Sequence, residues 1–264
     1  MPQTEPKTVV DDDGEAADWH RRVVGRSLRT ATKRSIDRGH SLIRAAATIL
    51  ERSNGEGFTV QEVADEAGQS LRTLYQYFES KDDLLLAVFE EAMRTYARLI
   101  GDAIVDLTDP QERLAGAMIT SVRLPEFSGS GVDRGLARLR LKLGEVDPEL
   151  VARSQQPVTA LVRDLIAEAA ATGQIRVADP DEATYMVLAL KSSFVTNQTL
   201  GNDSGVKLPT VFTLTAFCLA GLGASFDDGW LESVNDRLHL PERSITMDAR
   251  PRAKRAPRAA KPRG

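Results

Sequence analysis

The chain has 264 residues, of which 42% are hydrophobic and only 5% aromatic, with a single cysteine and a formal net charge of -4. This length suffices for one or two domains with a sizeable core, and few aromatic residues beside abundant Ala, Leu and Val favour packed helices. The lone thiol, Cys218, excludes a disulfide framework or a thiolate cluster for zinc or iron, and it indicates a reducing compartment such as the cytosol.

Charge is divided unevenly along the chain. Residues 1–20 carry one basic and six acidic side chains, and residues 21–81 carry 11 basic and seven acidic ones. Residues 82–248 carry 15 basic and 25 acidic side chains, whereas residues 249–264 carry seven basic and no acidic ones. Two positive regions therefore accompany an acidic body, which suggests a polyanionic partner that meets the ends of the chain rather than its middle.

The N-terminal part divides into three segments. Residues 1–20 lack periodic apolar positions and the apolar stretch of a signal peptide, so we expect a disordered acidic lead. Residues 21–38 form a basic extension that we expect to be partly helical. A firm helix follows and ends at Asn54-Gly55. Its apolar face is marked by residues at helical spacing, namely Ile36, His40, Ile43, Ala47 and Leu50.

Residues 39–81 carry the signals of short helices joined by tight turns. Thr59 and Glu62 have the spacing of a capping box, in which the hydroxyl accepts from the third helical N–H and the carboxylate reaches back to the cap. Gly68 suits the left-handed conformation in which many helices end. The sequence therefore predicts a helix of about two turns between Thr59 and Gly68.

A second short helix is predicted to start at Ser70, with Leu74 and Phe78 on one face and mostly polar residues elsewhere. Ser80 gives another start signal, for a long helix. Two short helices separated by three or four residues, the second with a polar face, are typical of a helix-turn-helix.

Residues 82–240 contain helical patterns separated by turn signals such as Asp147-Pro148 and Asp179-Pro180, with no useful alternating strand pattern. The sequence therefore predicts an all-α fold. The longest uncharged run, residues 208–226, is a poor membrane span because Pro, Thr and Gly interrupt it, which favours a helix buried on all sides or between subunits. Residues 241–264 are predicted to be a disordered basic tail.

One run in this region resembles a known family. Residues 67–81, Ala-Gly-Gln-Ser-Leu-Arg-Thr-Leu-Tyr-Gln-Tyr-Phe-Glu-Ser-Lys, follow the pattern A-G-V-S-x-G-T-L-Y-x-Y-F-x-S-K of the TetR (tetracycline repressor) family of bacterial transcriptional regulators. The resemblance covers about 50 residues, from Ser41 to about Glu91. It implies an N-terminal three-helix helix-turn-helix DNA-binding domain and a C-terminal helical ligand-binding and dimerisation domain. A regulator of this kind, usually a repressor, leaves a palindromic operator when a small molecule binds.

The second helix of the helix-turn-helix carries the candidates for reading bases. Its first turn would enter the major groove, so Arg72 and Thr73, with Gln76 a turn later, would face base edges. Leu71 either points inward or contacts a thymine methyl group. The family pattern has Val and Gly where this chain has Gln69 and Arg72, so the operator sequence is not transferable from relatives.

Other residues of the motif suit phosphate oxygens, and the resemblance implies the same set. Thr59 and Tyr77 carry hydroxyls, Lys81 places an ammonium at a helix start, and Ser70 stands at the start of the second helix. Tyr75 divides its ring between core and phosphate. The basic extension, including Arg34 and Arg38, and the basic tail either contact DNA or are solvated.

The resemblance also implies that the last two long helices, about Asp181–Leu200 and Thr210–Leu222, pair with their mates in a four-helix dimer interface. Apolar and small residues permit this independently: Tyr185, Leu188, Ala189, Ser192, Phe212, Ala216, Leu219 and Ala220. The alternative is that these helices complete a monomer core. In a two-fold dimer the recognition helices lie about 34 Å apart, which predicts a palindromic operator.

A ligand pocket would be walled by the central helices. Its candidates are Met118, Leu139, Leu143, Val158, Leu161, Leu165, Met186, Phe194 and Asn197, the last as a polar anchor. Residues at this spacing are also what a plain core requires. Ligand would act by binding better to the arrangement whose recognition helices are wrongly spaced.

Enzymatic activity is not expected, because the chain has none of the common nucleophile, phosphate-loop, dinucleotide or zinc-protease motifs and its three histidines are far apart. We expect no cofactor and no metal. The expected partners are a double-stranded DNA operator, an unidentified small-molecule inducer and a second copy of the chain, in the bacterial cytoplasm and at the nucleoid when DNA is bound, with no membrane association. The alternative function is an architectural, weakly specific DNA-binding protein that uses its basic termini.

Overall fold

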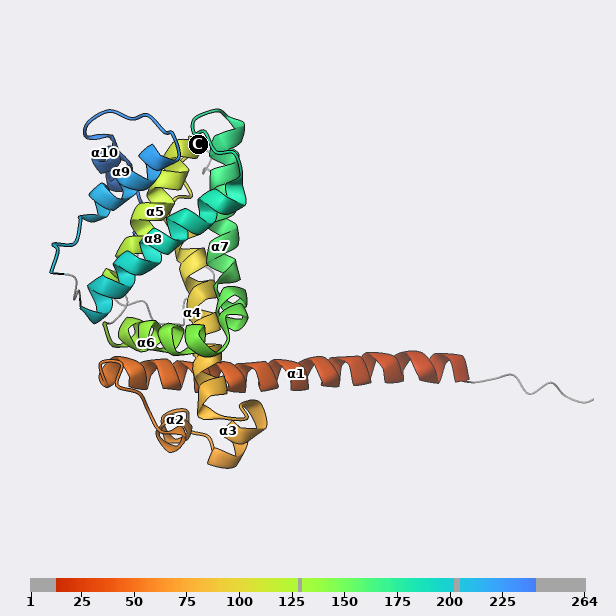
Figure 1. The fold of residues 1–264 in the computed structure, drawn as a ribbon. Helices are drawn as coiled ribbons and strands as arrows, with labels where there is room; N and C mark the ends of the chain where they lie inside the picture. The colour runs from red at the N-terminus through yellow and green to blue at the C-terminus, as the bar shows by residue number, and fades with distance from the viewer. Residues whose placement is uncertain (1–12, 128–129, 202–204, 241–264) are drawn as a thin grey trace, which may run out of the picture. The chain divides into compact units, whose positions relative to one another are not determined.

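The computed structural model describes residues 13–127, 130–201 and 205–240, and their regular structure is entirely helical (Figure 1). The all-α prediction is confirmed. The chain divides into two compact units, residues 1–42 and 43–264. In the first unit the described residues belong to one helix, α1 (Asp13–Arg52), whose last turns belong to the second unit.

The start of α1 differs from the sequence analysis. The helix begins at Asp13, inside the lead of residues 1–20 that was expected to be disordered, and continues through the basic extension. Residues 15–24 contain no Gly or Pro and include Ala16-Ala17, so nothing in the local sequence stops a helix there. Residues 13–20 are therefore helical. The rest of the expected lead, residues 1–12, and the expected tail, residues 241–264, lie outside the described residues.

The turn signals of the helix-turn-helix act as predicted. Before α2 (Val60–Glu66), the Thr59 N–H donates to Glu62 Oε2 at 2.7 Å and the Glu62 N–H donates to Thr59 Oγ1 at 3.2 Å. After it, Gly68 has a φ of +63°, and the next N–H, that of Gln69, donates to the Ala64 carbonyl at 2.9 Å. This is the hydrogen bonding of a left-handed helix exit, which needs glycine.

The second helix of the motif, α3 (Leu71–Tyr77), is capped by Ser70, whose Oγ accepts from the Thr73 N–H at 3.0 Å. Ser80 likewise caps α4 (Lys81–Ala103). A small core lies beneath these helices, and its largest side chains are almost fully buried: Leu50, Val63, Leu74, Leu84 and Val88. The predicted short helices and their caps are confirmed, and α3 is held by its apolar side.

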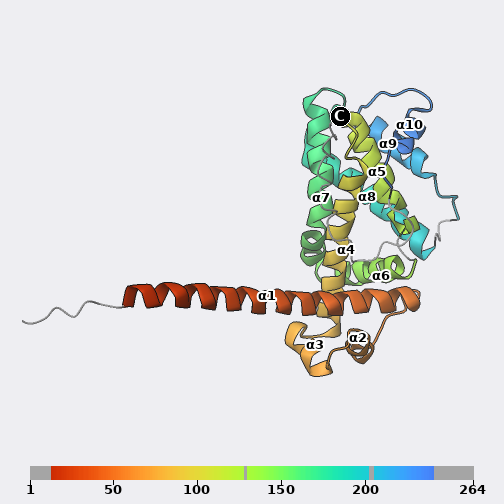
Figure 2. The ribbon, with the colours of Figure 1, turned by 180° about the vertical axis from the view of Figure 1, so that it is seen from behind.

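In the described part of the second unit, seven helices build the rest of the structure (Figures 1 and 2): α4, α5 (Pro110–Phe127), α6 (Ser130–Val146), α7 (Pro148–Ala171), α8 (Pro180–Leu200), α9 (Val211–Gly221) and α10 (Trp230–Asp236). α5 contacts α4, α7, α8, α9 and α10, and it therefore lies at the centre of the large hydrophobic core. The two helices expected near the C-terminus, Asp181–Leu200 and Thr210–Leu222, are found as α8 and α9.

α9 is buried along one side only. Leu214 and Cys218 lie in the core, whereas Phe217 is 67% exposed. The uncharged run at residues 208–226 is therefore not a helix buried on all sides. Within residues 13–127, 130–201 and 205–240, no helix has the length and apolarity needed to cross a membrane.

α6 makes a close main-chain contact with the end of α1. A Cβ on Gly131 would lie 2.5 Å from the carbonyl oxygens of both Leu50 and Glu51, a separation that no side chain tolerates. Further along α6, the Arg138 guanidinium donates to the Gly55 carbonyl at 2.9 Å. This contact fixes α6 against the turn that follows α1, at the edge of the helix-turn-helix.

Candidate functional site

The outer surface of α3 presents polar side chains to solvent. Arg72 and Gln76 are exposed, while Leu74 behind them is fully buried. Thr73 and Leu71 are half-buried at the start of the helix. The face of α3 that carries Arg72 and Gln76 is therefore accessible, and the buried Leu74 packs behind it.

The aromatic residues of α3 are placed differently from each other. Tyr75 is 51% exposed, so about half of the residue is accessible to solvent. Tyr77 is half-buried. The division of Tyr75 between core and phosphate stays a prediction.

The hydroxyl groups around the motif are engaged in helix caps. The hydroxyls of Ser70 and Thr73 lie 2.8 Å apart, and the Thr59 hydroxyl donates to Glu62 Oε2 at 2.8 Å. These hydrogen bonds from the Thr59 backbone and side chain lower the pKa of Glu62, with smaller contributions from Lys81 and Arg52. These hydrogen bonds orient the Ser70, Thr73 and Thr59 side chains in the absence of a partner.

The predicted cations also lie at the surface. Lys81 is exposed, and its Nζ lies 5.3 Å from the centroid of the Phe58 ring, a cation–π distance that orients the ammonium. Arg34 and Arg38 are exposed on the part of α1 that belongs to the first unit. Their contact with DNA stays a prediction.

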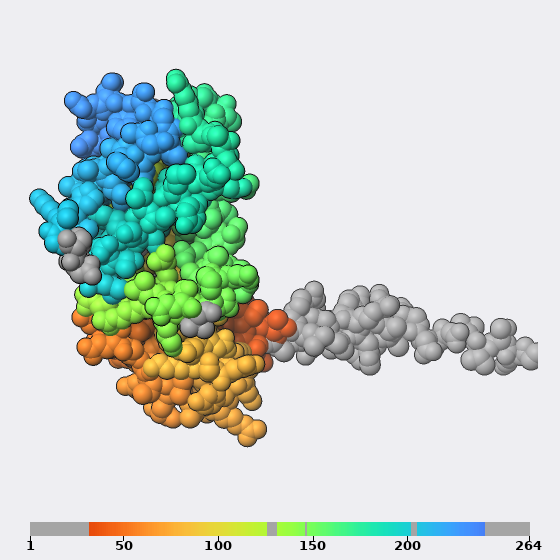
Figure 3. Space-filling model, in the orientation of Figure 1, coloured from red at the N-terminus to blue at the C-terminus, as the bar shows by residue number. Residues whose placement is uncertain are grey.

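Atoms of α8 and α9 reach the surface on the same face of the molecule (Figure 3), and both helices carry exposed apolar side chains. Of the predicted dimer residues, Tyr185 is 75% exposed and Ala189 and Ala220 are exposed. Four are half-buried: Leu188, Ser192, Phe212 and Ala216. Leu219 is fully buried in the core, so its assignment to the dimer interface is wrong.

Sequence reasoning missed three large apolar residues on this surface. Met186 is 59% exposed, Leu190 is 42% exposed and Phe217 is 67% exposed. The pairs 185/189, 186/189 and 186/190 are three or four positions apart, so their side chains are neighbours on the surface of one helix. This helical spacing of apolar residues could have indicated the exposed apolar face of α8 from the sequence. We call the exposed residues Tyr185, Met186, Ala189, Leu190 and Phe217 the α8/α9 surface.

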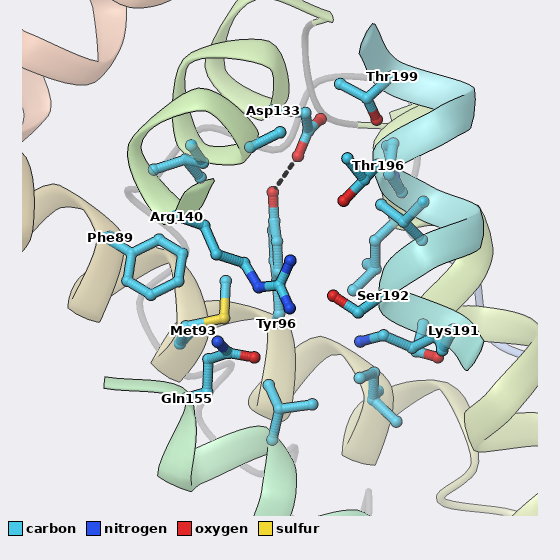
Figure 4. Close-up of a pocket in the computed structure, with 18 residues that line it drawn as sticks. Phe89, Met93, Tyr96, Asp133, Arg140, Gln155, Lys191, Ser192, Thr196 and Thr199 are labelled. Carbon is cyan, nitrogen blue, oxygen red and sulfur yellow. Dashed lines mark hydrogen bonds between the residues drawn. The ribbon is translucent and has the colours of Figure 1, made fainter. Parts of the chain in front are cut away.

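A cavity of about 100 Å³ lies between α4, α5, α6, α7 and α8 (Figure 4). Its wall is largely apolar, with Phe89, Met93 and Tyr96 from α4 and Leu136 and Ala137 from α6. Other side chains complete the wall: Ile100, Ser121, Leu124, Pro125, Asp133, Arg140, Gln155, Val158, Lys191, Ser192, Val195, Thr196 and Thr199.

Most predicted pocket residues lie elsewhere. Val158 lines this cavity, and Met118 borders a much smaller one beside it. Leu139, Leu165 and Phe194 are buried and Leu143 and Leu161 half-buried, all outside the lining of the larger cavity.

Two pocket predictions are contradicted by the structure. Met186 is exposed on the α8/α9 surface, because the opposite side of α8 faces the cavity. The Asn197 side chain donates to the Ser193 carbonyl of its own helix at 2.9 Å instead of anchoring a ligand. Conversely Ser192, predicted for the dimer interface, lines the cavity.

The polar groups of the cavity come from different helices. The Tyr96 hydroxyl on α4 donates to the Asp133 carboxylate on α6 (Figure 4). Arg140 on α6 and Lys191 on α8 point into the same space. Burial, and then the neighbouring charge of Arg140, lower the pKa of Lys191 to about 8, and burial alone lowers the pKa of Arg140.

One sequence signal for this cavity was overlooked. Lys191 is the only charged residue between Glu182 and Asp203, within a helix that is otherwise apolar or neutral. A lone cation in such a helix requires a reason. The periodicity of apolar residues, on which the pocket prediction was based, does not detect it.

The residues around the helix-turn-helix are similar to known proteins. Residues 42–88 match the family described as "Bacterial regulatory proteins, tetR family". The HTH-type transcriptional regulator HbdR of Aromatoleum sp. (strain CIB) is 34% identical over 93 residues, which are 35% of this chain and 41% of HbdR. BetI of Brucella canis is 31% identical over 91 residues, which are 34% of this chain and 46% of BetI. The chain thus spans less than half the length of these curated relatives.

Solved structures resemble a larger part of the chain. RolR, crystallised with the ligand resorcinol, has a TM-score of 0.58 at 20% identity and covers 81% of this chain and 100% of its own. FadR from Bacillus subtilis, in complex with stearoyl-CoA, has a TM-score of 0.55 at 22% identity and covers 69% of this chain and 98% of its own. These similarities extend the shared fold beyond the helix-turn-helix to the C-terminal helices.

Proposed function

We propose that this chain, whose helix-turn-helix domain belongs to the TetR family of bacterial regulatory proteins, is a dimeric transcriptional repressor that a small molecule releases from a palindromic operator. The observation that carries the proposal is the outer face of α3, where Arg72 in the first turn and Gln76 a turn later are exposed over the buried Leu74. A capped helix that presents its N-terminal side chains in this way fits the major groove.

Arg72 and Thr73 are the proposed base readers. An arginine guanidinium donates two parallel hydrogen bonds to O6 and N7 of guanine, the commonest specific contact in the major groove. Gln76 and Leu71 lie within reach of neighbouring bases. Tyr75, Tyr77, Thr59, Ser70 and Lys81 surround them and suit phosphate oxygens, which position the helix without reading sequence.

The α8/α9 surface is the proposed dimer interface. A monomer that leaves Tyr185, Met186 and Phe217 each more than half exposed on adjacent helices has an apolar surface suited to a partner. Small residues such as Ala189 and Ala220 allow two helix pairs to approach closely. A two-fold axis through this surface makes the complex symmetric, and the operator is then palindromic.

The cavity is the proposed ligand site, and α6 is the proposed connection to the DNA-binding domain. One face of α6 supplies Asp133, Leu136, Ala137 and Arg140 to the cavity wall, while Gly131 lies against the end of α1. A ligand that favours a different position of α6 therefore changes the placement of α3. The similar fold of RolR and FadR, crystallised with resorcinol and with stearoyl-CoA, supports a small-molecule site in the helical domain.

Domain limits follow from these roles. Residues 39–81 form the proposed DNA-binding domain and residues 82–240 the proposed ligand-binding and dimerisation domain. Residues 21–38 are a basic extension that forms part of α1, and we propose that it contacts the duplex next to the operator. Such a regulator acts in the cytoplasm.

Selection of genomic fragments with the purified protein tests the proposal. A specific regulator prefers its operator over random DNA by about 10³-fold or more at physiological salt, whereas an architectural protein that uses its basic termini shows little preference. A preference below this range would contradict the proposed function.

Two variants then separate base reading from phosphate contact. We expect Arg72→Ala to cost about 1–3 kcal/mol per half-site and to relax the preference at one base position, whereas Lys81→Ala should weaken all sequences alike and lower the salt slope by about one. Arg153→Ala, an exposed arginine on α7, is the matched control. Equal losses of Arg72→Ala on operator and random DNA would show that Arg72 reads no base.

A further inference from the structure

Two cations from different helices share the wall of the cavity. Arg140 extends from α6 and Lys191 from α8, and the charge of one lowers the pKa of the other (Figure 4). Like charges repel, and the repulsion grows as water is removed. Folding alone gives no reason to bring these two side chains together.

Neither cation is neutralised within the protein. Among the described residues, neither Arg140 nor Lys191 makes a hydrogen bond or an ion pair, and Arg140 Nε is a buried atom without a partner. Asp133 is the one acidic residue among the described residues that line the cavity, and it accepts from the Tyr96 hydroxyl. The cavity wall therefore holds one buried donor without an acceptor, Arg140 Nε, and beside it an ammonium without a counter-charge, which is costly unless another molecule supplies the acceptor and the negative charge.

The remaining wall suits an apolar group. Phe89, Met93, Leu136 and Val158 present hydrocarbon or thioether surface to the same space. The cavity volume of about 100 Å³ is comparable with the roughly 150 Å³ of an engineered cavity that binds benzene. Its size suits one aromatic ring or a short aliphatic chain.

We propose that the cavity binds a small organic carboxylate, with the anionic head between Arg140 and Lys191 and the apolar body against Phe89, Met93 and Leu136. The identification rests on the proposed function, because it names the chemical class of the effector. The planar guanidinium matches a carboxylate with two parallel hydrogen bonds, and the ammonium adds a point charge. Ser192 and Thr196, which also line the cavity, offer hydroxyls beside the head group.

A neutral ligand would fill the same volume less well. It would remove water from Arg140 and Lys191 without replacing the lost hydrogen bonds. An inorganic anion would satisfy the charges but leave Phe89 and Met93 facing an empty apolar space. Only a molecule with both parts matches the whole wall.

Matched pairs of probes test this inference on the full-length protein. Benzoate and benzamide differ in charge but hardly in shape, as do hexanoate and hexanamide, and inorganic phosphate supplies a head without a body. Binding is measured by calorimetry and by the shift in unfolding temperature. We expect each carboxylate to bind at least about tenfold more tightly than its amide and than phosphate.

Variants locate the site. Arg140→Gln and Lys191→Met should each weaken carboxylate binding by at least about tenfold and bring carboxylate and amide affinities together. Arg153→Gln, which changes an exposed arginine on α7, should bind as the wild type does. If a variant fails to fold, the other still tests the site, since each removes one of the two charges.

Several results would overturn the inference: amides that bind as tightly as carboxylates, phosphate that binds as tightly as both carboxylates, no binding by any probe, or an equal loss in Arg153→Gln. None of these depends on DNA. Fragment selection on the same protein tests the proposed function separately, so anion binding without a preferred operator would leave this inference standing and remove the repressor.

Discussion

Replacing Lys191 by methionine should stabilise the protein in the absence of ligand. Burial and the charge of Arg140 lower the pKa of Lys191 from 10.5 to about 8. Each unit of pKa corresponds to about 1.4 kcal/mol, so the charged ammonium lowers the free energy of unfolding by about 3 kcal/mol at neutral pH. Methionine keeps a linear side chain of similar length without the charge, and Lys191→Met should recover up to about 3 kcal/mol.

The gain should depend on pH in a defined direction. Because the pKa of Lys191 is lower in the folded than in the unfolded chain, the folded chain binds fewer protons between pH 8 and 10.5. The destabilisation is fully present below pH 8 and disappears as the pH rises towards 10.5. The advantage of Lys191→Met should therefore fall from about 3 kcal/mol at pH 7 to about 1.5 kcal/mol at pH 9.5.

Urea unfolding followed by circular dichroism, at pH 7 and pH 9.5 and at one fixed protein concentration, measures both quantities. Lys207→Met, at an exposed lysine, is the control and should change the free energy of unfolding by less than about 0.5 kcal/mol. If Lys191→Met were no more stable than the wild type at pH 7, or gained the same amount at both pH values, the ammonium would not be a buried, uncompensated charge.

Three further predictions concern other parts of the molecule. Gly131→Ala should cost about 1–3 kcal/mol in chemical unfolding and weaken DNA binding, because its Cβ would lie 2.5 Å from two carbonyl oxygens. Gly144→Ala, on the same helix with open space around it, should be neutral or stabilising, and equal behaviour of the two would contradict the contact. Phe217→Glu should shift the protein towards monomer in sedimentation, whereas Val105→Glu, an equally exposed position outside α8 and α9, should not; a dimer that survives Phe217→Glu would place the interface elsewhere. Cys218 is buried and its pKa is raised by burial to about 11, so a thiol reagent at pH 8 should react only as the protein unfolds, and rapid labelling of the native protein would show that α9 opens readily.

The features predicted correctly from the sequence are those that depend on neighbours in the chain. The caps at Thr59, Ser70 and Ser80 each need only a hydroxyl and an N–H three residues later, and all three form. Gly68 likewise needs only its own backbone freedom. The ends of the short helices could therefore be predicted from neighbouring residues alone, without knowledge of any long-range contact.

The residues placed wrongly depend on which side of a helix meets the core. α8 carries apolar residues on all sides, so its sequence did not distinguish the face with Met186, which is exposed, from the face with Val187, which is buried. Leu219 was assigned to a partner although the protein's own core covers it. The lone Lys191 indicated an unusual polar site on α8. The sequence did not show that Arg140, 51 positions earlier and on another helix, lines the same cavity.

The prediction for the start of α1 was wrong for a different reason. An acidic composition suggested a lead without structure, but the helix reaches back to Asp13. Composition describes whether a segment can build a core, whereas a helix that continues from an ordered one needs no nucleation of its own. The propensity of residues 15–24 was the better guide.

The contact between α6 and the end of α1 includes a main-chain part, where Gly131 meets two carbonyl groups directly, and a side-chain part, where Arg138 donates to the Gly55 carbonyl. Every amino acid carries the same carbonyl group, so the main-chain part depends on few side chains besides the hydrogen of the glycine. The opposite face of the helix, with Leu136, Ala137 and Arg140, is free to diverge. A few substitutions on the cavity-facing side of α6 can therefore change which ligand binds, while the contact between α6 and the end of α1 is retained.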